Sequence, residues 1–193
     1  DTPAGADCAS AGYEEGEHGF AFPFDRMPAW RALGGGDFPI GVSGDVGVLR
    51  IAAFGENQFA GACAKVFRAG MGARALQLAV RERQQAQLRA ALSSLRQAGA
   101  QQLLVDVTGN GGGSEWVSEV IALMTPRRMS RAEVRVAAPR CDRRGAWQGK
   151  PNCDVFGPAD ARAQLQGSGE WAGPVSVLAD RNTASAAEDL VAW

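Results

Sequence analysis

Two short segments of the sequence contain residue types that could carry out catalysis. One is a glycine-rich run, residues 106–113 (DVTGNGGG), which directly follows an apolar stretch. A loop of this kind exposes backbone N–H groups, which an oxyanion hole uses to stabilise developing negative charge. The other is residues 182–188 (NTASAAE), in which Ser185 lies between small residues. A serine at a strand-to-helix turn is accessible to substrate and could act as a nucleophile.

Other interpretations of these segments were weighed. A phosphate-binding P-loop ends in Gly-Lys-Ser/Thr, whereas Ser114 and Glu115 follow the glycines here. A dinucleotide-binding fingerprint would need a third glycine where Ser114 stands. No glycine flanks Ser185, so the segment differs from a GxSxG elbow. Taken alone, each segment also fits a purely structural interpretation, the first as a flexible turn and the second as a helix cap.

The elements that must position these segments alternate between strands and helices. Residues 46–54, 103–107, 134–138 and 174–178 are predicted strands, because they are short apolar runs rich in β-branched residues. Helices are predicted at 81–98, with Gly99 just after the end, at 114–124 with Ser114 as N-cap, at 159–166, and from 182 onward. This alternation predicts an α/β fold with a substantially parallel sheet. Each catalytic segment then follows a strand, so a nucleophile and oxyanion donors could meet.

Composition excludes several function classes. The chain has 193 residues, 20 basic and 21 acidic, for a formal net charge of −1. Near-neutrality argues against nucleic acid as a partner, and no run approaches the ~18 apolar residues of a membrane span. With one histidine and no CxxC motif, no metal site or cofactor is expected. The start of the chain has no signal-peptide pattern, although one could have been removed.

The four cysteines suggest an oxidising compartment. An even count fits disulfide bonding, and Cys141 and Cys153 bracket a polar stretch that resembles a disulfide-stapled insertion. Reduced, buried thiols are the alternative. We expect a periplasmic or secreted protein on this basis.

Three groups of residues in order along the chain resemble the core of the tail-specific, or C-terminal processing, serine proteases. They are 46–51 (VGVLRI), 103–106 with 110–113 (LLVD, NGGG), and 171–178 with 183–188 (WAGPVSVL, TASAAE). The resemblance implies a ClpP/crotonase-like fold with a repeated strand-strand-helix core, here truncated at its C-terminus. It assigns residues 46–193 to the protease-like core, with the insertion at 141–153, and leaves residues 1–45 without a clear role.

The resemblance also implies roles for individual residues. Ser185 would be the nucleophile of a serine endopeptidase that cleaves peptides or proteins, and Gly112 and Ala186 would donate the oxyanion-hole N–H groups. Glu188 would support the general base, which in most members is a lysine downstream of the serine. That lysine is expected beyond Trp193, and residues 1–193 alone are expected to be inactive. Neither Lys65 nor Lys150 matches its position.

Two departures from the family pattern stand out. Thr108 occupies a position where the family usually has arginine, which puts the anchoring of the glycine loop in doubt. No PDZ module is recognisable in residues 1–45.

A histidine base, His18, remains an alternative. So does a non-catalytic ligand-binding protein of the same fold, with Phe20, Phe22 and Phe24 lining a pocket, and so does a crotonase-type acyl-CoA enzyme. The oligomeric state is open.

Overall fold

The computed structural model describes residues 4–114, 116–132, 136–137, 155–156 and 162–193. The chain forms two compact units. Unit 1 contains residues 1–127 and 167–193, and unit 2 contains residues 128–166. Cys141 and Cys153, with the predicted insertion between them, lie outside the described residues.

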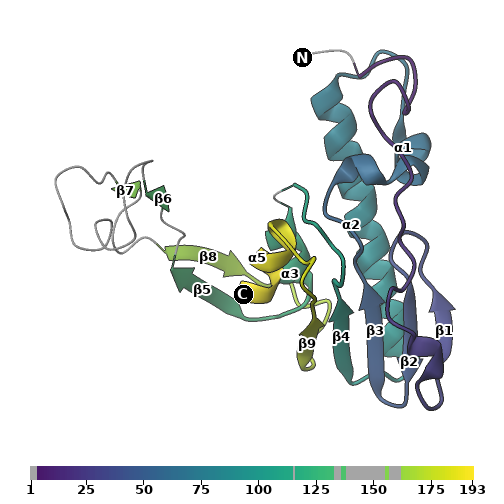
Figure 1. Cartoon of the computed structure of the whole chain (residues 1–193), viewed down its shortest axis with the longest axis vertical. Helices are drawn as coiled ribbons and strands as arrows, with labels where there is room; N and C mark the ends of the chain where they lie inside the picture. Colours follow the sequence, from purple (N-terminus) through teal and green to yellow (C-terminus); the bar gives the residue numbers. More distant parts are fainter. Residues whose placement is uncertain (1–3, 115, 133–135, 138–154, 157–161) are drawn as a thin grey trace. The chain divides into compact units, whose positions relative to one another are not determined.

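A five-stranded mixed sheet forms the centre of unit 1 (Figure 1). Its strands are β1 (Arg31–Gly34), β2 (Ile40–Ser43), β3 (Val46–Arg50), β4 (Gln102–Asp106) and β9 (Val175–Leu178), in the spatial order β1-β2-β3-β4-β9. The first three strands pair antiparallel, whereas β3, β4 and β9 pair parallel. The predicted α/β class and its parallel strands are therefore confirmed. The segment with no predicted role, residues 1–45, supplies β1 and β2.

The long helix α2 (Ala73–Gln97) lies along one face of the sheet, and the N-terminal segment passes over the other (Figure 1). The buried stripe of α2 includes Leu88, Leu92 and Leu95, the residues from which the helix was predicted. The helix starts at residue 73, eight residues before the predicted start at 81. Leu76 and Val80 continue the same apolar stripe through that extra length, so the predicted helix was too short at its N-terminus.

The connection between β3 and α2 holds the N-terminal segment in place. It contains a 3₁₀ turn, η2 (Glu56–Gln58), and helix α1 (Ala60–Val66). Cys63 of α1 forms a disulfide with Cys8. A further 3₁₀ turn, η1 (Phe24–Arg26), precedes β1. The sequence did not reveal this cysteine pairing, because the two residues are 55 positions apart.

Two short helices follow the candidate catalytic segments. Helix α3 (Val117–Leu123) begins after Trp116, so the prediction of Ser114 as its N-cap was wrong. The buried Trp116 indole instead donates to the carbonyl of Phe54 at 2.7 Å and fixes the chain there. Helix α5 (Ala186–Ala192) begins directly after Ser185 and contacts α3.

Unit 2 consists of two antiparallel strand pairs. Strand β5 (Arg128–Ala132) pairs with β8 (Arg162–Gln166), and β6 (Val136–Ala137) pairs with β7 (Val155–Phe156). The helix predicted at 159–166 was wrong over its described part, because residues 162–166 are β8. Their exposure alternates along the strand, as expected of an antiparallel pair with one face less exposed than the other.

Candidate active site

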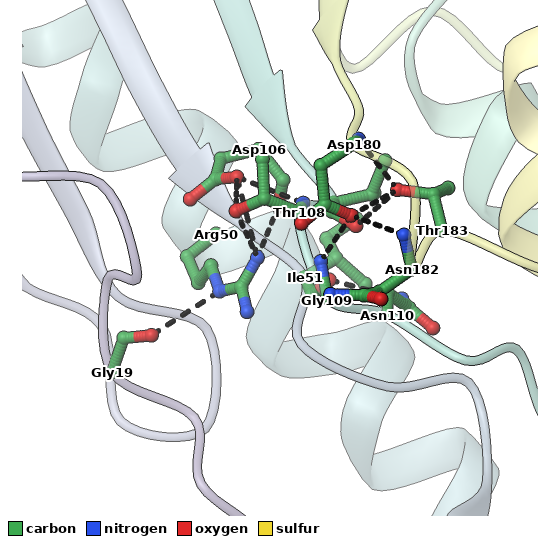
Figure 2. Close-up of polar contacts among 11 residues, drawn as sticks. Gly19, Arg50, Ile51, Asp106, Thr108, Gly109, Asn110, Asp180, Asn182 and Thr183 are labelled. Atoms are coloured by element: carbon green, nitrogen blue, oxygen red, sulfur yellow. Dashed lines mark hydrogen bonds and ion pairs between the residues drawn. The ribbon is translucent and has the colours of Figure 1, made fainter.

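The two candidate catalytic segments meet at one edge of the sheet. Strands β4 and β9 are parallel neighbours, so the loops that follow them, 107–113 and 179–185, leave the same edge. Three contacts join the loops: Gly109 N–H donates to Asp180 Oδ1 at 2.9 Å, Thr183 Oγ1 donates to the Val107 carbonyl at 3.1 Å, and Ala184 N–H donates to the Asn110 carbonyl at 3.0 Å. Figure 2 shows the contact between Gly109 and Asp180, with Thr183 beside it. Sequence segments about 70 residues apart therefore form one site.

Ser185 has a strained backbone at the start of α5. Its φ is 54° and its ψ is −122°, a backbone conformation that residues other than glycine rarely adopt. Strain of this kind, about 1–3 kcal/mol, persists only where the surroundings fix it, and it gathers at functional sites. The Glu188 carboxylate accepts the Ser185 N–H at 2.8 Å and so helps to hold the turn. The serine itself is exposed.

Gly112 packs directly against the serine turn. A Cβ atom added at Gly112 would lie 2.6 Å from Ser185 Cβ, 2.8 Å from the Ala184 carbonyl oxygen and 3.1 Å from the Ala186 nitrogen. The φ of Gly112 is also +99°. Only glycine fits this approach without displacing the serine. The structure thus brings Ser185, Gly112 and Ala186 together, as the sequence predicted, with Glu188 one helical turn away.

The two predicted oxyanion donors differ in their availability. Gly112 N–H donates to Asn110 Oδ1 at 2.8 Å. Asn110 is fully buried, and its Nδ2 donates to the Ile51 carbonyl at 3.0 Å, so its carboxamide is fixed from both ends. Ala186 N–H, in contrast, is an amide of the first turn of α5 and donates no hydrogen bond to any residue that the structure describes.

A buried ion pair anchors the start of the glycine loop (Figure 2). Arg50 of β3 reaches across to β4, and its Nη1 lies 3.3 Å from Asp106 Oδ1 and 3.4 Å from Thr108 Oγ1. Asp106 Oδ1 also accepts the Thr108 N–H and Oγ1–H, and Arg50 Nε donates to the Gly19 carbonyl. The arginine that the resemblance led us to expect at position 108 is absent, yet the Arg50 guanidinium from the neighbouring strand contacts this turn. The loop therefore has the anchor that Thr108 had put in doubt.

Asp180 fixes the loop that leads to the serine. Its Oδ1 accepts the N–H groups of Gly109 and Asn182, at 2.9 and 3.0 Å. The hydrogen bond from Gly109 is the largest cause that lowers the pKa of Asp180 below its ordinary value of 3.8. The carboxylate is thus ionised at neutral pH and joins both loops. The sequence-based predictions missed Asp180, although Asp and Asn close together after a strand, as in residues 180–183 (DRNT), are a common turn signal.

Other candidate residues lie elsewhere in unit 1. His18 Nε2 is 3.0 Å from the Gln58 carbonyl oxygen, and its ring stacks on Phe59. Lys65 lies on α1 and lines a cavity with Arg83. No contact joins either side chain to Ser185 in the part of the chain that the structure describes. Lys150 lies outside that part.

A search of the described residues found no cluster of three potential metal ligands among His, Cys, Asp and Glu side chains. The same residues contain no helix that is both long and apolar enough to cross a membrane.

Comparisons with known proteins identify the family. Residues 45–193 match the model of peptidase family S41. A crystal structure of a candidate peptidase from Parabacteroides merdae is similar, with a TM-score of 0.50 and 17% identity; the match covers 84% of this chain and 40% of that one. At this identity the likeness supports the fold alone. No curated protein matches the chain. Because the family match spans most of the chain, including loops 107–113 and 179–185, this protein belongs to peptidase family S41.

Proposed function

We propose that this protein is a serine endopeptidase that hydrolyses peptide bonds through an acyl-enzyme on Ser185. The observation that carries the proposal is the strained, exposed Ser185 at the start of α5, with Gly112 packed against it. Membership of a peptidase family supports a peptide or protein as substrate. In the first step, Ser185 Oγ bonds to the substrate carbonyl carbon and loses its proton to a base. The amine then leaves with a proton, and water releases the acyl group.

Two N–H groups are proposed to bind the oxyanion. Ala186 N–H is open and lies at a helix N-terminus, where partial positive charge favours an anion. Gly112 N–H donates to the neutral Asn110 Oδ1 in the resting site. A charged oxygen is a stronger acceptor than a neutral amide oxygen. We therefore propose that the Gly112 N–H turns from Asn110 toward the oxyanion as it forms.

The general base is proposed to be a lysine that the family resemblance places after residue 193. Burial would lower the pKa of such a lysine and let its neutral amine accept the serine proton. Glu188 binds the backbone N–H of Ser185. Its proposed role is therefore to hold the nucleophile's turn, in addition to any support of the base.

We further propose that the protein acts in the periplasm or outside the cell. The Cys8–Cys63 disulfide supports this location, because disulfides persist mainly in oxidising compartments.

A ligand-binding function without catalysis is the second candidate. One observation favours it: Phe20, Phe22 and Phe24 line a cavity of about 370 Å³ together with Trp30. Phe22 is 48% exposed, whereas Phe24 is buried. The rings contact one another, with centroids 4.9–5.7 Å apart. An apolar ligand would have to cover Phe22.

Hydrolysis of a quenched fluorescent peptide library by the full-length protein tests the first proposal. We expect cleavage that disappears in Ser185→Ala. Ser176→Ala removes another exposed serine, on β9, and should leave cleavage unchanged. Cleavage that persists in Ser185→Ala would show that another residue is the nucleophile.

A further inference from the structure

A cavity of about 400 Å³ opens beside the glycine loop. Its walls come from the N-terminal segment, the connection after β3, the first turn of α2 and the end of the glycine loop. This volume falls within the range of small-ligand sites. Gly113 forms part of the wall, and the preceding residue, Gly112, packs against Ser185. The cavity wall therefore lies one residue along the glycine loop from the contact with the proposed nucleophile.

A buried carboxylate is the charged group of this cavity wall. Glu56 is 3% exposed, and its Oε1 accepts hydrogen bonds from Arg81 Nε and Nη2 at 2.8 and 2.7 Å. Its Oε2 is held less closely, by Gln77 Nε2 at 3.4 Å. Arg81 also lies 4.0 Å from the Glu119 carboxylate. Two carboxylates thus share the Arg81 guanidinium, and a second guanidinium, that of Arg74, lies 3.2 Å from Gln77 Oε1.

Glu56 is the charged residue that lines the cavity itself. Burial raises the pKa of Glu56, but hydrogen bonds from Ser114, from its own backbone N–H, and then from Arg81 and Gln77 outweigh burial and bring the pKa below its ordinary value of 4.5. Glu56 is therefore ionised at neutral pH. Burial, and after it the charge of Glu56, raises the pKa of Tyr13, which lines the same cavity. The negative field of Glu56 thus extends into the cavity.

We infer that this cavity binds a basic side chain, of lysine or arginine, from the peptide substrate. The inference rests on the proposed peptidase function and names one feature of its substrate. An ammonium or guanidinium group in the cavity would pair with Glu56 Oε2 and satisfy an acceptor that Gln77 contacts only at 3.4 Å. Small wall residues, Ala4, Ala11 and Ala73, leave room for the aliphatic stem of such a side chain.

Because the Cys8–Cys63 disulfide holds the N-terminal segment, it also holds one wall of this cavity. Ala4, Ala11 and Tyr13 lie on either side of Cys8 in sequence, and all three line the cavity. Residues 1–45, which had no assigned role, would thus contribute to substrate selection.

Peptide turnover by the full-length protein tests the inference. The substrates are quenched peptides that carry lysine, arginine, norleucine or glutamate at one position, scanned along the peptide. At one position we expect kcat/KM for lysine and arginine to exceed that for uncharged norleucine about tenfold, the size of one charged hydrogen bond. Glu56→Gln should remove this preference, whereas Glu14→Gln, which removes a charge from an exposed neighbour of Tyr13, should keep it.

A second readout separates this inference from the proposed function. Labelling of Ser185 by a small fluorophosphonate does not require the cavity, so its rate should be unchanged in Glu56→Gln. If Glu56→Gln does not fold, Ala73→Leu fills the cavity from the first turn of α2, leaves the ion pair intact, and should lower turnover of the lysine peptide selectively. A labelled wild-type protein that cleaves the lysine and norleucine peptides equally at every position would overturn the inference. Absence of labelling would instead overturn the proposed function, and the inference with it.

Discussion

Three neighbouring glycines of the glycine-rich loop offer a graded test of the close approach between Gly112 and Ser185. Gly111 has an ordinary φ and nothing within 4 Å of an added Cβ. Gly109 has a φ of +69° and the same open space. Gly112 combines a φ of +99° with a Cβ position only 2.6 Å from Ser185 Cβ. Alanine therefore adds no strain at position 111 and backbone strain alone at position 109. At position 112 it adds both backbone strain and a clash.

The expected losses of unfolding free energy follow this order. Gly111→Ala should be neutral or slightly stabilising, because alanine restricts the unfolded chain. Gly109→Ala should lose about 1–2 kcal/mol, the cost of a left-handed backbone with a side chain. Gly112→Ala should lose about 2–5 kcal/mol, because overpacking adds a further 1–3 kcal/mol. Urea unfolding, with a check that the slope m is unchanged, measures all three.

The same series should separate stability from catalysis. In conditions where each variant is folded, Gly112→Ala should lower the rate of Ser185 labelling by about 10²–10³, the size of losing one oxyanion donor, because the clash displaces the residue 112 N–H from the serine turn. Gly109→Ala and Gly111→Ala should change the rate far less, since neither Cβ approaches the serine. If Gly112→Ala matches Gly111→Ala in both stability and labelling, the inferred contact between the loops is wrong.

Three further predictions concern the anchors of the site. Arg50→Met leaves the buried Asp106 carboxylate unpaired, so the free energy of unfolding should fall by about 3–5 kcal/mol in urea titrations. The pKa of Asp180 is lowered in the folded state, so its stabilising effect is complete above the ordinary value of 3.8 and lost as pH falls through the lower folded value. The stability difference between wild type and Asp180→Asn should therefore vanish at the acid end of a pH series. Replacing Cys8 and Cys63 by alanine should lower the unfolding free energy by about 2–4 kcal/mol, and reductant should then have no further effect through this pair.

The sequence was most informative where local pattern and resemblance agreed. The strands around 103–107 and 174–178 were predicted from short apolar runs, and they are β4 and β9. Because both are parallel neighbours, the loops after them had to meet, and the grouping of Gly112 with Ser185 followed. The shared edge of a parallel sheet is a strong constraint that a linear motif can reveal.

Other features depend on contacts that no local pattern encodes. Arg50, on the neighbouring strand β3, contacts the turn where an arginine was expected at position 108. This contact becomes visible only when β3 and β4 are paired in register. The helix predicted at 159–166 is a strand over its described part, because pairing with β5 outweighs local propensity. The Cys8–Cys63 pairing joins distant residues, and four cysteines allow three connectivities.

The most direct test of the central claim is chemical labelling of the proposed nucleophile. The full-length protein is treated with a fluorophosphonate probe, and peptide mass spectrometry locates the adduct. The account predicts a stoichiometric adduct on Ser185 that is absent from Ser185→Ala. A folded, full-length protein that remains unlabelled at Ser185 would contradict it and favour the ligand-binding alternative.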